Sequence, residues 1–175
     1  MPKLLTMFSI ASRSLRVLCA VALAFLTSFT AQPHAIAASS AAIRAFDDVA
    51  VEERNFAGQS FVESEFSDAD LENADFSNAD LRGAVFNGVV LKGANLRGAD
   101  LSDGITYLTT FEGADLSDAV LSSAMMLRSR FKDAKVDGAD FSDAILDRVE
   151  ITRLCETAEG VNSKTGVDTR ESLGC

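Results

Sequence analysis

The sequence predicts a solenoid, a chain wound into stacked coils around an apolar interior, and three observations indicate it. Every fifth residue from Phe56 to Ile151 is apolar, with Thr106 as the exception. Alanine fills twelve of the twenty positions that lie two residues before these apolar residues. A period of five fits neither a helix, with about 3.6 residues per turn, nor a strand, with about 2, so ordinary helix or sheet packing does not explain it.

The residues around this period group into five-residue units. Three of them, Ala69–Asn73, Ala74–Asn78 and Ala94–Gly98, read ADLEN, ADFSN and ANLRG. In these units the chain resembles the pentapeptide-repeat family, over about 100 residues. The resemblance implies an all-β fold: a right-handed quadrilateral β-helix with one unit on each side and four units in each coil. Units covering residues 54–153 would make about five coils.

The charged residues test the length of the coil independently. Residues one coil apart are stacked neighbours about 4.8 Å apart, as in any hydrogen-bonded sheet. With twenty residues per coil, one outward column alternates in charge: Glu72, Lys92, Glu112 and Lys132. A coil of fifteen would place Lys92 between Ser77 and Tyr107, with no opposite charge on either side. The charges therefore favour twenty residues per coil.

Residues 1–37 have the pattern of a cleavable secretory signal peptide. Three basic residues precede the apolar run Val17–Phe29, and Ala35-Ile36-Ala37 supplies a small-x-small cleavage site. The apolar run is too short for a permanent membrane anchor. We therefore predict export, cleavage after Ala37 and no stable membrane insertion of the mature chain.

Cleavage changes the composition in a way that bears on function. The whole chain has a net charge of −10, and removing residues 1–37 takes away three basic residues and no acidic one, leaving −13. The single histidine, His34, is also lost, so no histidine remains for general base catalysis or metal binding. The acidic surface opposes binding to nucleic acid. We expect a protein that is not an enzyme and has no cofactor.

Both ends of the solenoid need covers, because open coils expose core residues and unpaired strand edges. Residues 38–53 are predicted to form the N-terminal capping segment, with a short helix over Ser39–Asp48. Residues 154–175 are predicted to form the C-terminal cap, with a short helix over Leu154–Gly160 that ends at glycine.

Two cysteines, Cys155 and Cys175, follow the last repeat. In an exported protein such a pair is most simply a disulfide, with two free thiols as the alternative. A tail with paired cysteines is similar to that of the thylakoid lumenal members of the pentapeptide-repeat family. This resemblance implies the thylakoid lumen of a cyanobacterium or plastid, with the periplasm as the alternative compartment.

Six aspartates directly precede the central residue of a repeat, and two of them, Asp80 and Asp100, lie one coil apart. Stacked carboxylates can bind a cation such as Ca²⁺ or act as an acid and base pair. Aspartate is also a common choice at this position in the family, so a structural role is favoured over either function. The six are Asp70, Asp75, Asp80, Asp100, Asp115 and Asp140.

One side of the predicted coil carries large apolar residues at outward positions, where the other sides carry mostly polar residues. These are Val85, Ile105, Tyr107, Met125, Leu127 and Ile145. Exposed apolar patches usually mark contacts. The patch is interpreted as a docking face for a protein partner or a second copy of the chain, with Tyr107 as a candidate anchor. The alternative is that the protein's own N-terminal or C-terminal segment covers it.

Thr106 interrupts the apolar series on this same side, stacked between Phe86 and Met126. Its buried hydroxyl is expected to form a hydrogen bond with the backbone or a trapped water, and a local bulge in the wall is the expected cause of the exception.

The sequence therefore favours an exported, non-enzymatic scaffold that presents a rigid face to another protein. Two alternatives are a redox-responsive protein that acts through Cys155 and Cys175, and a DNA mimic that modulates gyrase, as some acidic members of the family do. Export would separate a DNA mimic from its target enzyme.

Overall fold

The computed structural model describes residues 43–44 and 54–175. The chain divides into two units, Met1–Ser39 and Ser40–Cys175. The first unit, with the predicted signal peptide 1–37, lies outside the described residues, as does most of the predicted capping segment 38–53.

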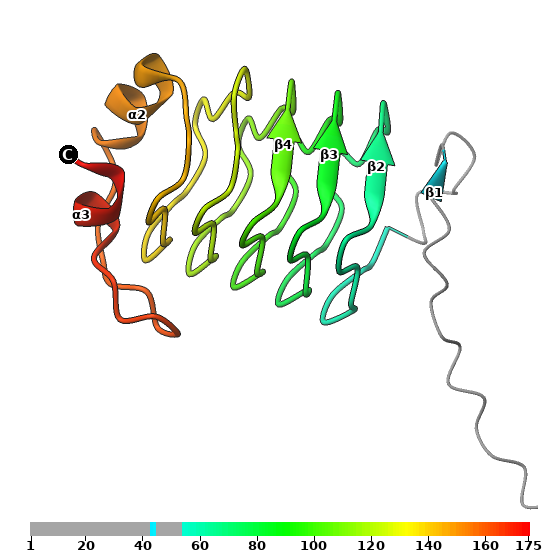
Figure 1. Cartoon of the computed structure of the whole chain (residues 1–175), viewed down its shortest axis with the longest axis horizontal. Helices are drawn as coiled ribbons and strands as arrows, with labels where there is room; N and C mark the ends of the chain where they lie inside the picture. The colour runs from blue at the N-terminus through cyan, green and yellow to red at the C-terminus, as the bar shows by residue number, and fades with distance from the viewer. Residues whose placement is uncertain (1–42, 45–53) are drawn as a thin grey trace, which may run out of the picture. The chain divides into compact units, whose positions relative to one another are not determined.

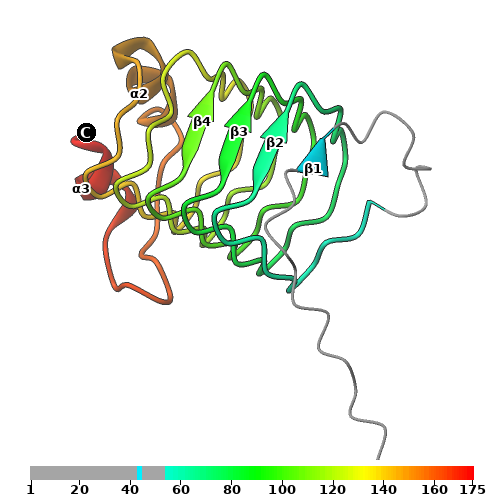
Figure 2. The same cartoon turned by 45° about the vertical axis from the view of Figure 1, so that its right-hand side comes forward.

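The described chain winds into stacked coils of twenty residues (Figures 1 and 2). Parallel bridges join residues twenty positions apart, as in the series Asp75, Asn95, Asp115 and Lys135. Successive bridges along one coil lie five residues apart, at Asp75, Asp80, Val85 and Val90. Each coil therefore has four sides with one repeat on each, which confirms the coil length predicted from the charges.

On one side of the coil the bridges extend into a parallel sheet of order β1-β2-β3-β4. Its strands are β1 (Ile43–Arg44), β2 (Glu65–Ser67), β3 (Val85–Asn87) and β4 (Ile105–Tyr107). The helix predicted over 39–48 is wrong at Ile43 and Arg44, which pair with Phe66 and Ser67 of β2. Pairing supplies hydrogen-bond partners to a strand edge that an isolated helix would leave open.

The five-residue period arises from a left-handed residue at each corner. The residue two positions after each central residue has a positive φ between Gly58 and Asp143, and most of these residues are glycine, asparagine or aspartate. These types adopt that conformation most readily. Gly88 has φ 69°, a conformation that glycine adopts without the strain that a side chain adds.

The interior is filled by the apolar series predicted from the sequence. Stacked rings run along the coil axis, with centroids of Phe66 and Phe86 4.6 Å apart and their planes at 5°. Phe111 and Phe131 stack in the same way at 5.0 Å. The alanines two residues earlier are almost all buried at the corners, where a larger side chain would not fit between coils.

Thr106 is fully buried, and the bulge expected there is wrong. Its Oγ1 has no hydrogen-bond partner among the described residues. The wall has no bulge there, because Thr106 pairs with Phe86 and its neighbour Ile105 pairs with Met125 in the twenty-residue register. The nearby hydroxyls that are bonded belong to Thr109, which donates to Phe86 O at 2.9 Å, and to Ser129, which donates to Thr106 O.

The wall ends earlier than predicted, because α2 spans Arg148–Leu154 rather than following residue 153. Ile151, the last member of the apolar series, therefore lies in a helix. Two carboxylates cover backbone donors of the coil beneath: Asp147 Oδ2 accepts from Arg128 N at 2.7 Å, and Glu150 Oε2 accepts from Phe131 N at 3.0 Å. These bonds replace those of a further coil, so the chain is free to turn into a helix.

The C-terminal cap contains a second helix, α3 (Thr169–Leu173), which the sequence analysis missed. Both helices lie at the same end of the coils (Figure 1). Leu154, Ala158 and Leu173 belong to the core cluster and cover that end. The predicted disulfide is present between Cys155 and Cys175, with a Cα–Cα distance of 5.7 Å.

The loop between the two helices is fastened to the wall by Asn162. Its buried amide nitrogen donates to the carbonyls of Asp118, Ala119 and Gly138 at 3.2, 3.1 and 2.8 Å. The cap is thus joined to the coils by polar contacts as well as by its apolar residues. Within the described part of the chain, no helix has the length and apolarity needed to cross a membrane.

Candidate protein-interaction face

The apolar residues predicted to share one side do lie in columns on that side. Val85, Ile105, Met125 and Ile145 are joined in sequence by parallel pairing, so they form one straight column across four coils. Ile105, Met125 and Ile145 expose 39%, 42% and 50% of their surface. Three adjacent large apolar side chains are therefore open to solvent.

Tyr107 and Leu127 lie on the same side, two residues further along their coils, and both are half-buried. The guanidinium of Arg128 lies over the Tyr107 ring, with Cζ 5.8 Å from the ring centroid. Tyr107 is therefore less open than the sequence suggested, and the Ile105 column presents the more exposed surface.

Leu108 belongs to the same surface and was missed by the sequence analysis. It is 50% exposed and adopts φ 57° at a left-handed corner. A signal for it was present, because Leu108 is the single large apolar residue at the corner positions of the described coils. We call Val85, Ile105, Tyr107, Leu108, Met125, Leu127 and Ile145 the apolar face.

Two arginines border the apolar face. Arg128 lies one coil beyond Leu108, and Arg148 begins α2 beside it. Both are exposed, and neither has a carboxylate within 4.0 Å among the described residues, whereas Arg82, Arg97 and Arg130 form ion pairs. Positive charge thus borders the patch on a chain whose net charge is −10.

The described C-terminal segment does not cover the apolar face, as the exposure of Ile105, Met125 and Ile145 shows. The other predicted cover, the N-terminal segment, lies outside the described residues except for Ile43–Arg44, which extend the sheet.

The six aspartates singled out in the sequence share one structural role. Each accepts a hydrogen bond from the backbone N–H two residues later, at 2.9–3.4 Å, which stabilises the turn of the repeat. Asp80 and Asp100 are paired across adjacent coils, as predicted. No group of three or more potential metal ligands was found among the described residues.

Three of these aspartates have a lowered pKa. At Asp80 the side-chain hydrogen bond from Arg82, at 2.7 Å, is the main cause. At Asp115 and Asp140 burial acts to raise the pKa, but hydrogen bonds from Ser117 and Ser142 outweigh it. All three are thus held in the charged form that accepts the turn hydrogen bond.

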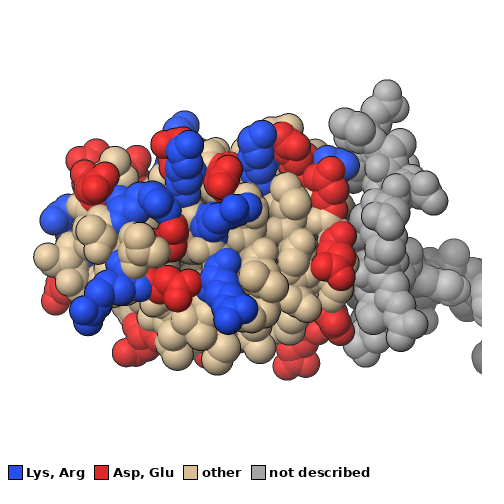
Figure 3. All heavy atoms as spheres, turned by 90° about the horizontal axis from the view of Figure 1, so that it is seen from above, with Lys and Arg blue, Asp and Glu red and all other residues tan. Residues whose placement is uncertain are grey.

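The predicted charge column is only partly formed. Lys92 Nζ lies 3.5 Å from Glu72 Oε1, as expected for residues one coil apart. Glu112 instead pairs with Arg130 Nε at 3.6 Å rather than with Lys132, and Arg130 lies two residues before Lys132 on the same side of the coil. Lysine, arginine and acidic side chains are interspersed on this surface (Figure 3).

Comparison with known proteins agrees with this architecture. The family model "Pentapeptide repeats" matches residues 55–103 in 8 copies. A solved pentapeptide repeat protein from the thylakoid lumen of Arabidopsis thaliana is 35% identical, over 69% of this chain and 90% of that one, with a TM-score of 0.36. The chain belongs to the pentapeptide repeat family.

Two further relatives are similar over shorter regions. The thylakoid lumenal protein TL20.3, chloroplastic, of Arabidopsis thaliana is 45% identical over 42 residues, which are 24% of this chain and 15% of that protein. This chain therefore matches only a small part of that relative's length. HetL from the cyanobacterium Nostoc, involved in heterocyst differentiation regulation, is 32% identical over 52% of this chain and 40% of that one, with a TM-score of 0.36.

Proposed function

We propose that this protein is a non-enzymatic scaffold whose apolar face binds a protein partner in the thylakoid lumen or, alternatively, the periplasm. The observation that carries the proposal is the exposed column of Ile105, Met125 and Ile145 on a rigid wall. Burying such side chains against a partner releases about 25 cal/mol for each Å² of apolar surface. The compartment rests on the similarity to thylakoid lumenal proteins.

The backbone at Leu108 supports a binding role. A left-handed conformation costs a residue with a large side chain about 1–2 kcal/mol relative to glycine. The equivalent residue one coil earlier is Gly88, which adopts the same conformation without that cost. An exposed leucine at a strained position lowers stability, so its presence points to a use outside the fold.

The arginines specify the chemistry of the partner. Arg128 and Arg148 lack carboxylate partners within the described residues, so an acidic group beside an apolar segment would complement this surface. The partner we propose is therefore a protein that presents apolar side chains flanked by aspartate or glutamate.

Chain length argues against cover of Met125 and Ile145 by the residues that precede β1. If cleavage follows Ala37, only five residues precede Ile43, and they extend about 17 Å at most. Met125 and Ile145 lie four and five coils from β1, about 19 and 24 Å at ordinary strand spacing. A mature N-terminus of that length does not reach these residues.

The proposal is tested with a double variant, Ile105→Glu with Met125→Glu, in the tagged mature chain. Val62→Glu is the matched control, because Val62 is also exposed but lies on another side of the coil. A partner is isolated with the wild-type chain from the native compartment, purified and titrated against each variant. We expect the double variant to lose binding at least tenfold and the control to keep it.

Melting temperatures distinguish the two interpretations of the apolar face. A docking face predicts nearly unchanged stability in the double variant, whereas a face covered by the chain itself predicts a clear loss. Unchanged binding by the double variant would refute the proposal. Arg128→Glu should bind the partner more weakly than the wild-type chain does. If the difference between the two affinities disappears at high salt, the result supports an acidic partner.

A further inference from the structure

The last coil leaves the corner at residues 133–136 of its wall without hydrogen-bond partners. In the coil beneath, that corner makes three bonds: Gly113 N to Lys132 O at 2.9 Å, Lys135 N to Ala114 O at 2.9 Å, and Leu116 N to Lys135 O at 2.8 Å. The equivalent groups twenty residues later are the N–H of Asp133, the C=O of Ala134 and the N–H of Val136. None of the three has a hydrogen-bond partner among the described residues.

Other donors on the same coil are covered by the cap. Phe131 N donates to the Glu150 carboxylate at 3.0 Å, Gly138 N to Glu159 O at 2.8 Å, and Phe141 N to Ser172 Oγ at 3.0 Å. The chain thus covers the edge on both sides of this corner, which lies where α2 has left the wall. A second corner of the same coil, with the N–H of Asp143, the C=O of Ala144 and the N–H of Leu146, also has no hydrogen-bond partners among the described residues.

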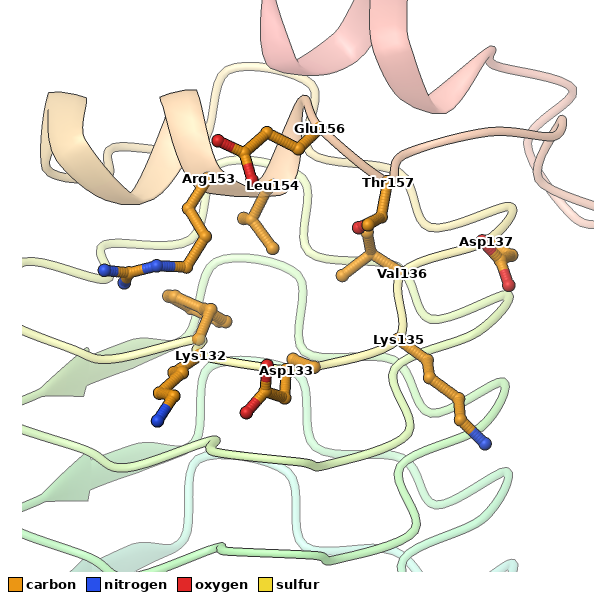
Figure 4. Close-up of a pocket in the computed structure, with 11 residues that line it drawn as sticks. Lys132, Asp133, Lys135, Val136, Asp137, Arg153, Leu154, Glu156 and Thr157 are labelled. Atoms are coloured by element: carbon orange, nitrogen blue, oxygen red, sulfur yellow. The ribbon is translucent and has the colours of Figure 1, made fainter.

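A pocket of about 490 Å³ occupies this corner (Figure 4). Residues 131–137 of the wall line one side, and Arg153, Leu154, Glu156 and Thr157 line the other. Leu154 points from α2 toward the wall, whereas Lys132 and Lys135 point away from α2 (Figure 4). Lys132, Asp133 and Lys135 are exposed beside the pocket, whereas Ala134 and Val136 line it as buried residues.

The charges around the pocket do not favour a simple ion. Three cationic residues, Lys132, Lys135 and Arg153, are balanced by three acidic ones, Asp133, Asp137 and Glu156. Arg153 is already bound to Glu150. The backbone groups without partners are a donor, Asp133 N–H, an acceptor, Ala134 C=O, and a second donor, Val136 N–H. An extended peptide complements this pattern of groups.

We propose that this corner binds a short extended peptide segment of a protein partner, which adds the missing part of a sixth coil. The segment would accept hydrogen bonds from Asp133 and Val136 and donate one to Ala134, as residues Lys132–Lys135 do for the coil beneath. Its third residue would stack above Ala134 and Ala114, so a small side chain fits there. This site is separate from the apolar face.

The test uses a peptide that copies residues 131–136, with the sequence FKDAKV, acetylated and amidated, because that sequence already makes these bonds within the protein. The peptide is titrated to about 2 mM into the isotope-labelled mature chain, and backbone amide resonances are recorded. We expect saturable shifts and slowed hydrogen exchange at Asp133 and Val136. A peptide methylated on the nitrogen that corresponds to Lys135 should lose most of its binding.

Thr157→Trp is designed to block the pocket from the protein's side, because Thr157 is exposed and lines the pocket. Thr152→Trp is the control, because Thr152 is an exposed residue of α2 that does not line the pocket. Thr157→Trp should abolish the shifts, while Thr152→Trp and the Ile105→Glu, Met125→Glu variant should keep them. Absence of saturable shifts, or equal binding of the methylated peptide, would overturn the proposal. Inorganic phosphate that shifts the same amides when the peptide does not would indicate an anion site instead.

Discussion

The carboxylate of Glu150 accepts a hydrogen bond from the backbone N–H of Phe131 at 3.0 Å. One coil earlier, the equivalent Phe111 N–H donates to the carbonyl of Arg130 at 2.8 Å. A side chain of α2 therefore replaces the backbone of a further coil, and this replacement is how the wall ends.

Substitution of Glu150 is expected to weaken the cap. Glu150→Ala leaves a buried N–H without a partner and removes the ion pair to Arg153, so the unfolding free energy should fall by about 1–3 kcal/mol. Glu150→Gln keeps an acceptor and should lose less. Glu156→Ala, on an exposed residue of the same segment, is the control, and chemical denaturation measures all three.

Thr106→Val is expected to stabilise the protein. The substitution keeps the shape of the side chain and removes a buried hydroxyl that has no hydrogen-bond partner, so we expect a gain of about 1 kcal/mol or more. Thr109→Val should have the opposite effect, because the Thr109 hydroxyl donates to Phe86 O at 2.9 Å. A loss of melting temperature in Thr106→Val would show that its hydroxyl is bonded.

Leu108→Gly is expected to increase the stability of the protein and to weaken its binding to the partner. Glycine adopts φ 57° without strain, so the unfolding free energy should rise by up to about 1 kcal/mol. If Leu108 contacts the partner, the same variant should bind it more weakly. Gly88→Leu, one coil earlier, reverses the change and should destabilise, since Gly88 has φ 69° and a leucine there is strained.

Acid should destabilise the turns in which an aspartate carboxylate accepts a backbone hydrogen bond. The pKa of buried Asp140 is lowered in the folded protein, so the unfolded chain binds more protons in acid. Its contribution is fully present above the unfolded pKa of about 4 and is lost as pH falls through the lower folded value. Melting temperatures between pH 7 and about 2 should therefore fall less steeply for Asp140→Asn than for the wild type.

Reduction of the Cys155–Cys175 disulfide should destabilise the C-terminal cap. The bond closes a loop with a sequence separation of 20 residues, and the chain-entropy relation gives about 3 kcal/mol for a loop of that size. Thiol titration under denaturing, non-reducing conditions checks that the bond forms in the exported protein. Two titratable thiols per chain would contradict it.

The sequence predicted the wall well because each of its positions repeats. The same requirement, a large residue inside and a small residue at the corner, recurs every five residues, so single exceptions such as Thr106 do not hide it. The ends were predicted less accurately. α2 begins at Arg148 rather than near Leu154, and Ile43–Arg44 form a strand rather than part of a helix.

In the candidate site, too, the sequence predicted some features and not others. Register alone placed Ile105, Met125 and Ile145 in one column, because positions twenty apart must stack. The cation–π contact that partly covers Tyr107, the strained backbone of Leu108 and the open corner at Asp133 depend on packing and on side-chain conformation. The pattern of residue types along the sequence does not predict these features.

By itself, the sequence determined a square coil of twenty residues with a Phe and Leu interior, because a periodic core leaves one register that buries every large residue. Tertiary structure alone decided where the coil stops and which backbone groups stay open. Those outcomes depend on single long-range contacts, such as Glu150 with Phe131, that occur once and so leave no period to detect.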